Sequence, residues 1–205
     1  LEDSAVRLEK ETGVQPATSL CNVTSQEDVD RLFVTATQVF GEADVVINNA
    51  GLGGTADLMD MTDDQWHVVL DVTLNGTFRM TRAAMQTMQG RGGVIVNNAS
   101  VLGWRAQKGQ AHYAAAKAGV MALTRCAGVE GAELGIRVNA VAPSLAMHPF
   151  LAKVTTEELL AELTAKEAYG RAAEVWEVAN VMVFLASDYS SYMTGETVSV
   201  SSQRA

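Results

Sequence analysis

The stretch Gly93-Val-Ile-Val-Asn-Asn-Ala-Ser100, together with Gly109-Gln-Ala-His-Tyr-Ala-Ala-Ala-Lys-Ala-Gly119 downstream of it, decides the fold of this chain. The first run is apolar up to its polar end, which is typical of a strand buried on both faces of a parallel sheet. The second run is rich in alanine, the strongest helix former. A buried strand followed by a helix is part of a βαβ unit, so the sequence predicts an α/β protein.

Three polar side chains in this stretch, Ser100, Tyr113 and Lys117, are candidate catalytic residues. Residues four apart share a helix face, with about 5–6 Å between their Cβ atoms, so the phenol and the ammonium point into the same space. Ser100 closes the strand, at the edge where open α/β sheets bind ligands. A free tyrosine has a pKa near 10, and a nearby cation lowers it. We therefore predict proton transfer by Tyr113 at an alcohol or carbonyl oxygen, with Lys117 lowering the tyrosine pKa and Ser100 orienting the substrate.

Considered one at a time, the tyrosine and the lysine also fit ordinary structural roles. Tyr113 could be a half-buried helical tyrosine with a bonded hydroxyl, and Lys117 a solvated lysine. It is their order and spacing behind Ser100 that favours the catalytic interpretation.

Strand-like and helical runs alternate along the rest of the chain. We expect strands near residues 17–22, 43–48, 93–98, 136–142 and 197–200, and helices over 1–12, 25–40, 62–89, 109–134, 156–168 and 174–187. This alternation predicts one domain, residues 1–205, in which helices cover both faces of a parallel sheet. The least regular segment, 143–172, predicts a lid over the active site; an exposed helix pair is the alternative.

The composition excludes several classes of function. The 205-residue chain is 48% hydrophobic with a mean hydropathy of +0.08, enough to build a sizeable core. A net charge of −9 argues against nucleic acid and anionic membranes as partners. No apolar run reaches 18 residues, so we expect no membrane span. Cys21 and Cys126 predict reduced, buried thiols in a cytoplasmic protein, and the scattered histidines predict no metal site.

Several further stretches carry a resemblance to a known family. They are Cys21-Asn22-Val23-Thr24, Asn48-Asn49-Ala50-Gly51, Arg137-Val-Asn-Ala-Val-Ala-Pro143, Phe184-Leu-Ala-Ser-Asp188 and Thr194-Gly195-Glu196. With the ordered serine, tyrosine and lysine, they make the chain resemble the short-chain dehydrogenase/reductase family from about Pro16 to its end. The resemblance implies a doubly wound Rossmann-like parallel sheet, NAD or NADP as cofactor, and interconversion of a secondary alcohol and a ketone.

The resemblance also implies a set of cofactor-binding residues. Asn22 and Val23 would flank the adenine, and Asn49, Ala50 and Gly51 would line the ribose region. Ala146 would contact the nicotinamide end. Tyr113 and Lys117 would also contact the cofactor, Lys117 by bonding the ribose hydroxyls.

The largest departure from the family is an absence at the start of the chain. The family begins with a strand, a glycine-rich turn and a second strand, about 45–55 residues that have no counterpart before Leu1. In the family's strand order these two strands lie between the strands expected near 17–22 and 43–48. We therefore expect an incomplete chain in which those two strands do not pair directly. The residue that selects NAD or NADP would lie in the missing part.

Other departures concern the proton relay and the seating of the cofactor. Thr73 stands where the family has an asparagine, and we predict that its hydroxyl holds a water; Asn75 is expected to be solvated or at an interface. Ser144 and His148 replace a glycine and a threonine. The tail Ser201-Ser202-Gln203 replaces Asp-Gly-Gly.

The loop Val101-Leu-Gly-Trp-Arg-Ala-Gln-Lys108 suggests a substrate class. Trp104 would form an apolar wall, and Arg105 with Lys108 a phosphate clamp for an acyl-CoA; alternatively both cations are simply solvated. The loop is similar to actinobacterial members that oxidise ring hydroxyls on CoA thioesters during steroid breakdown. The chain is also similar to 3-oxoacyl-carrier-protein reductases, and a Rossmann-like binding or scaffold protein without turnover is a third possibility.

Finally, the two long helices predict an oligomer. Met80, Ala83, Ala84, Met121, Leu123 and Cys126 put small and apolar side chains on more than one helix face. One face already serves the sheet, so we expect the other to form four-helix contacts in a homodimer or homotetramer, although these residues could also be monomer core.

Overall fold

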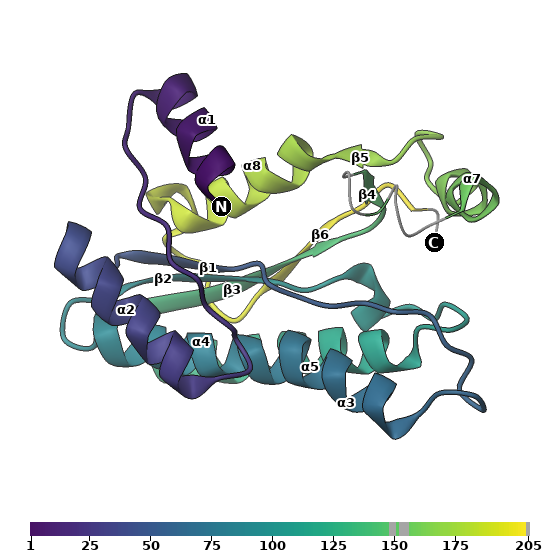
Figure 1. Cartoon of the computed structure of the whole chain (residues 1–205), viewed down its shortest axis with the longest axis horizontal. Coiled ribbons are helices and arrows are strands. Elements are labelled where there is room, and N and C mark those ends of the chain that lie inside the picture. Colours follow the sequence, from purple (N-terminus) through teal and green to yellow (C-terminus); the bar gives the residue numbers. More distant parts are fainter. Residues whose placement is uncertain (148–150, 152–155, 204–205) are drawn as a thin grey trace.

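The computed structural model describes residues 1–147, 151 and 156–203, and it shows a parallel sheet between two layers of helices (Figure 1). The sheet contains β1 (Val45–Asn48), β2 (Gly93–Asn98), β3 (Ile136–Pro143) and β6 (Thr197–Val200), in the order β1-β2-β3-β6. All three pairings are parallel. The predicted α/β architecture is confirmed, and these four strands lie where the sequence predicts them.

The fifth predicted strand, near residues 17–22, is wrong. This segment is irregular, and Leu20 is 80% exposed. A strand needs a partner for its backbone hydrogen bonds. Among the described residues, β1 pairs only with β2, so no strand lies against the 17–22 segment. The two segments are thus not paired with each other, as the strand order of the family requires.

Helices cover both faces of the sheet (Figure 1). One face is covered by α2 (Gln26–Phe40), α3 (Asp63–Leu70), α4 (Gly76–Met88) and α5 (Ala111–Ala132). The other face carries α1 (Glu2–Thr12) and α8 (Val175–Ala186). The helix α7 (Glu157–Ala165) lies near the two-stranded sheet of β4 (Ala146–Met147) and β5 (Ala173–Glu174).

Hydroxyl caps set the starts of α2 and α3. The Ser25 side chain accepts a hydrogen bond from the Asp28 backbone N–H and caps α2. Thr62 and Gln65 bond each other reciprocally in a capping box at the start of α3.

The helix predicted over 62–89 is not a single regular helix. A π-helical turn, Asp71–Asn75, separates α3 from α4. Such turns are rare and are often found at functional sites. Here the turn contains the fully buried Thr73.

The hydrophobic core fills both sides of the sheet. On one side Met88 and Ile95 pack with Ile136, and at the carboxyl ends of the strands Val120 and Met121 pack with Ala140. On the other side Leu185 of α8 packs with Val141 and its neighbours.

Three of the residues expected at an oligomer interface belong to the monomer. Ala83, Ala84 and Met121 are at most 6% exposed within the single chain, so the sequence-based assignment of these three residues to a subunit contact is wrong. They contact the core because the helices that carry them pack directly on the sheet. Cys126 is exposed, so the prediction that both cysteines are buried is also wrong. Both cysteines are free thiols.

The segment 143–172 is described only in part. Its described elements are the end of β3, the short strand β4, Leu151 and helix α7, while His148, Phe150 and their neighbours lie outside the described residues. A lid role for this segment and the single-domain boundary stay predictions. Within the described residues no helix is long and apolar enough to cross a membrane, and no cluster of acidic, histidine or cysteine side chains suits a metal ion.

Candidate active site

Ser100 lies at the carboxyl end of β2, as predicted. Its backbone is extended, with φ −168° and ψ 152°, and its Oγ accepts a hydrogen bond from the Leu102 N–H at 3.2 Å. This bond caps a short 3-10 turn, Val101–Gly103. The turn packs closely on α5, because a Cβ on Gly103 would lie 2.6 Å from Met121 Cε. A glycine at this position therefore brings the serine loop against the helix that carries the other two residues.

Tyr113 and Lys117 lie on one face of α5, as their spacing predicts. The Lys117 Nζ is 5.5 Å from the centroid of the Tyr113 ring. Lys117 is 3% exposed, and its ammonium donates a hydrogen bond to the backbone carbonyl of Asn98, at the end of β2. The lysine thus ties the helix to the strand that ends in Ser100.

Burial shifts the pKa of both groups in the direction that favours the neutral form of each side chain. It raises the pKa of the Tyr113 phenol above 10.0, against the opposing effect of a hydrogen bond with Ser100. Burial also lowers the pKa of Lys117 from 10.5 to about 8. The sequence predicted a lowered tyrosine pKa. In the protein alone this is wrong, because the loss of solvation disfavours the phenolate.

The predicted ribose-binding loop, Asn49–Gly51, lies beside this set. The Asn49 Oδ1 accepts a hydrogen bond from Asn98 Nδ2 at 2.8 Å. A Cβ on Gly51 would lie 3.6 Å from Lys117 Nζ, so the loop passes close to the ammonium. Asn98 Oδ1 is buried and has no hydrogen-bond partner among the residues that the structure describes. An unpartnered acceptor between Lys117 and Asn49 suits a ligand with hydroxyl donors, and the ribose of a nicotinamide nucleotide fits this description.

Thr73 does not have the role that the sequence suggested. Its hydroxyl donates to the Leu52 carbonyl and accepts from the Leu52 N–H, each at 2.9 Å. The single hydroxyl proton is therefore used on the backbone, and the prediction that this hydroxyl holds a water is not supported. Thr73 instead anchors the end of the Asn49–Gly51 loop. Asn75 is exposed and bonds Asp71, as expected for a solvated residue.

The other predicted cofactor residues lie outside this contact set. Asn22 is bonded within its own turn to Thr24, and a Cβ on Gly76 at the start of α4 would meet Val23 at 2.7 Å. Ala146 forms β4 and packs with the core on the α8 side. The structure thus brings together Ser100, Tyr113, Lys117 and the Asn49–Gly51 loop. Asn22, Val23 and Ala146 make their described contacts elsewhere.

Sequence analysis missed Asn98 and His112. Asn98 touches both Lys117 and Asn49, and its signal was a polar residue at the end of an otherwise apolar strand. His112 precedes Tyr113 and is 1% exposed, and in the described part of the chain its Nδ1 has no hydrogen-bond partner. A Cβ on Gly54 would lie 3.3 Å from its Nε2.

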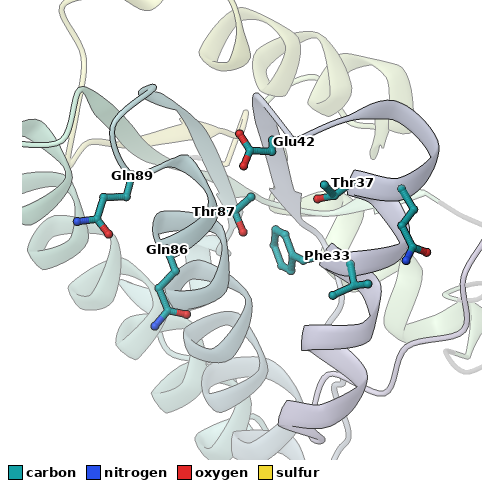
Figure 2. A pocket seen from close by; sticks show the side chains of 8 residues that line it. Phe33, Thr37, Glu42, Gln86, Thr87 and Gln89 are labelled. Atoms are coloured by element: carbon teal, nitrogen blue, oxygen red, sulfur yellow. The ribbon is translucent and has the colours of Figure 1, made fainter.

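A hollow on the surface lies away from these residues (Figure 2). It has a volume of about 510 Å³ and is lined by Phe33, Val34, Thr37, Gln38, Glu42, Gln86, Thr87 and Gln89, between α2 and α4. None of the predicted site residues lines it. Its one carboxylate, Glu42, is paired with Arg91, so the hollow offers no reacting group. Ser100, Tyr113 and Lys117 stay the candidate site, because their hydroxyl, phenol and ammonium groups can take part in proton transfer.

A serine at the end of a parallel strand, with a tyrosine and a lysine on one face of the following helix, is the arrangement that the resemblance to short-chain dehydrogenases and reductases predicts. Comparisons with known proteins agree. The family model for enoyl-(acyl carrier protein) reductases matches residues 1–202. A solved structure of a short chain dehydrogenase from Mycobacterium smegmatis superposes with a TM-score of 0.85 at 52% identity, covering 100% of this chain and 78% of that one. The chain belongs to the short-chain dehydrogenase/reductase family.

Two curated relatives are informative about function. The (5R,7aS)-5-hydroxy-7a-methyl-1-oxo-2,3,5,6,7,7a-hexahydro-1H-indene-carboxyl-CoA reductase of Mycobacterium tuberculosis is 61% identical over 186 residues, which is 90% of this chain and 71% of the relative. The 3-oxoacyl-[acyl-carrier-protein] reductase FabG of Salmonella typhimurium is 34% identical over 200 residues, 97% of this chain and 82% of the relative.

Proposed function

We propose that this protein interconverts a secondary alcohol and a ketone on a fused-ring acyl group carried by coenzyme A, with NAD or NADP as cofactor. The geometry of Ser100, Tyr113 and Lys117 carries the proposal. The 61% identical relative, a reductase of a bicyclic CoA ester, supports the substrate class.

The raised pKa of Tyr113 suits the direction of ketone reduction. At neutral pH the phenol holds its proton and can donate it to the substrate oxygen. Ser100, 8% exposed, donates a second hydrogen bond to the same oxygen and stabilises the charge that builds on it. Lys117, with a pKa of about 8, is still mostly an ammonium at pH 7 and favours negative charge on the phenol once the proton has left.

The cofactor would be held by the residues around Lys117. A bound nicotinamide nucleotide supplies the hydride. Lys117 and the Asn49–Gly51 loop would bind its ribose, and the free acceptor on Asn98 is available to a ribose hydroxyl. Asn22 and Val23 would flank the adenine, and Ala146 would contact the nicotinamide end.

Replacing Tyr113 by phenylalanine tests the proposed role. Tyr113→Phe removes only the hydroxyl, so the fold and the binding of NADH or NADPH should be unchanged, while turnover falls at least 10³-fold, in the upper range for general acid catalysis. Turnover is followed by the absorbance of the reduced nucleotide with a fused-ring oxoacyl-CoA. Tyr192→Phe, at a fully exposed tyrosine, is the matched control and should keep wild-type turnover. A retained turnover number in Tyr113→Phe contradicts the assignment.

Two other functions are separated by the same assays. Activity with acetoacetyl thioesters but none with polycyclic substrates would favour a 3-oxoacyl-[acyl-carrier-protein] reductase, which the 34% identical relative represents. If fluorescence titration of the intact protein shows no binding of NADH or NADPH, a scaffold protein without turnover is the better explanation.

A homodimer or homotetramer formed through α4 and α5 also remains part of the proposal. Val129, 74% exposed on α5, and Phe78, 43% exposed on α4, support a contact on the outer helical face. Sedimentation velocity on the wild type and on Val129→Asp tests it, since a buried carboxylate at the contact should release the monomer. A monomeric wild type contradicts it.

A further inference from the structure

One buried charge has no part in the proposed chemistry: the carboxylate of Glu167. Glu167 follows α7 and is 2% exposed. Its Oε2 accepts hydrogen bonds from the Ser202 hydroxyl at 2.7 Å and from the Ser202 N–H at 3.2 Å, and its Oε1 accepts a longer one from the Leu145 N–H at 3.5 Å. Among the described residues no cation lies within salt-bridge distance of it.

These bonds fasten the C-terminal segment Ser201–Gln203 between two other parts of the chain. The Ala168 N–H donates to the Ser202 carbonyl at 2.6 Å, and Glu167 forms an antiparallel bridge with Gln203. On the other side, the Ser144 N–H after β3 donates to the Val200 carbonyl at 3.1 Å. Figure 1 shows the yellow segment that follows β6 running toward α7. We call this arrangement the Glu167 clasp.

The clasp extends to the catalytic loop through Gln203. The Gln203 Oε1 accepts a hydrogen bond from Arg105 Nη1. Arg105 is exposed, five residues after Ser100, and follows the half-exposed Trp104. In the described part of the chain it pairs with no carboxylate, whereas its neighbour Lys108 pairs with Asp57 at 3.0 Å. The neutral amide of Gln203 orients the guanidinium without neutralising its charge, and Arg105 therefore remains able to bind an acceptor group.

Among the described residues only neutral groups donate to the Glu167 carboxylate, and a buried carboxylate without a cation contributes little to stability because its desolvation is costly. The Glu167 carboxylate does join the backbone at Leu145 to the C-terminal segment Ser201–Gln203. Gln203 of that segment in turn contacts Arg105. We propose that Glu167 is a positioning residue, and that its clasp lets Gln203 hold Arg105 where the guanidinium binds an oxygen acceptor of the substrate. This rests on the proposed function and adds a substrate-binding residue to the same site.

The experiment is a double-mutant cycle on the intact enzyme, with a fused-ring oxoacyl-CoA as substrate. Glu167→Gln keeps the shape but presents an N–H group to the donors of Leu145 and Ser202. We expect Glu167→Gln and Arg105→Gln each to raise the substrate KM about tenfold, with kcat and the cofactor KM changed less than about twofold. The substrate KM of the double variant should be no higher than that of Arg105→Gln alone, because both changes remove the same interaction with the substrate.

Matched controls keep the result interpretable. Glu162→Gln, on the exposed face of α7 and paired with Lys166, should leave the substrate KM unchanged. If Glu167→Gln does not fold, Ser202→Ala and Gln203→Ala replace it, and each should raise the substrate KM without changing kcat. Three outcomes would each overturn the proposal. The effects of the two substitutions on the substrate KM could multiply in the double variant, the substrate KM could stay unchanged, or only kcat or the cofactor KM could change. If the wild type does not turn over the fused-ring oxoacyl-CoA, the proposed function fails; if it does and the substrate KM of Glu167→Gln is unchanged, only the proposal about the clasp fails.

A shortened substrate identifies the acceptor group. The N-acetylcysteamine thioester of the same acyl group lacks the phosphates of coenzyme A. If Arg105→Gln raises the KM of both thioesters, the guanidinium binds a carbonyl on the acyl side. If the effect is confined to the CoA thioester, it binds a phosphate.

Discussion

At the scale of single residues, burial shifts the pKa values of the two ionisable groups of the site in opposite directions. It raises the pKa of Tyr113, which keeps the phenol protonated, and lowers the pKa of Lys117 to about 8. The protein has to hold a buried ammonium at neutral pH, with the Asn98 carbonyl as its described hydrogen-bond acceptor. A group that is costly to bury and contacts the reacting tyrosine is typical of a functional site rather than of a stabilising one.

The cost of burying Lys117 predicts an unusual dependence of stability on pH. Its pKa is about 8 in the folded chain and near 10.5 when unfolded, so between these values the unfolded chain binds more protons and stability rises with pH. Lys117→Met should therefore be more stable than the wild type at pH 7, by roughly 2 kcal/mol after the lost hydrogen bond is subtracted. Urea unfolding at pH 7 and pH 10 should show this difference shrinking. Lys10→Met, at an exposed lysine of α1, should show no such change.

Thr73 allows a second test at this scale. Thr73→Val keeps the shape and removes both bonds to Leu52, which should cost about 1–3 kcal/mol and raise the cofactor KM, because the Asn49–Gly51 loop loses its anchor. Thr73→Ser keeps the hydroxyl and should behave like the wild type in both measurements. If the valine and serine variants have the same stability and the same cofactor KM, the Thr73 hydroxyl does not hold the loop.

At the scale of elements, the site depends on how closely α5 approaches its neighbours. Glycines allow this approach: Gly103 brings the serine loop onto the helix, and Gly128 brings the helix onto the backbone before β6. The π-helical turn between α3 and α4 has a related effect, since it contains the Thr73 that holds the loop next to Lys117. Such close contacts tolerate little change, because well-packed interiors have no spare volume.

Gly128→Ala tests this dependence. Alanine is the better helix former by about 0.5–1 kcal/mol, but its Cβ would lie 2.5 Å from the Gly195 backbone nitrogen. We expect the steric term to dominate and to destabilise the protein by about 1–3 kcal/mol in chemical denaturation. Ala115→Gly, at an exposed position of the same helix, measures the propensity alone. A stabilised Gly128→Ala would mean that α5 can move away without cost.

At the scale of the whole molecule, one side chain joins the sheet to the layer on its α8 side. The Arg137 guanidinium, on β3, donates hydrogen bonds to the carbonyls of Leu185, Ser187, Ser190 and Met193 and to the Ser190 hydroxyl. These acceptors lie at and after the end of α8, in the segment that leads to β6. A single cation thus links β3 to the end of α8 and to the segment before β6, where the Ser190 hydroxyl and the Asn139 amide donate to some of the same carbonyls.

Arg137→Met should therefore destabilise the protein by about 1–3 kcal/mol, because it removes these charge-assisted hydrogen bonds, although each of the four carbonyls keeps another donor in the chain. Chemical denaturation measures the change, and Arg125→Met, at an exposed arginine of α5, should change stability by less than about 0.5 kcal/mol. A small effect of Arg137→Met would indicate that water replaces the guanidinium.

The sequence by itself was sufficient for the four sheet strands, for every helix except the one interrupted at Asp71–Asn75, and for the shared location of Ser100, Tyr113 and Lys117, because periodicity and i,i+4 spacing are local properties of a chain. Only the tertiary structure decided what depends on partners distant in sequence. It left 17–22 without a strand neighbour, assigned the Thr73 hydroxyl to Leu52, placed Ala83, Ala84 and Met121 in the monomer core, and buried Glu167 against Ser202. The direction of the Tyr113 pKa shift belongs to the same group, because a neighbouring cation can be inferred from spacing, whereas loss of solvent is a property of the folded molecule.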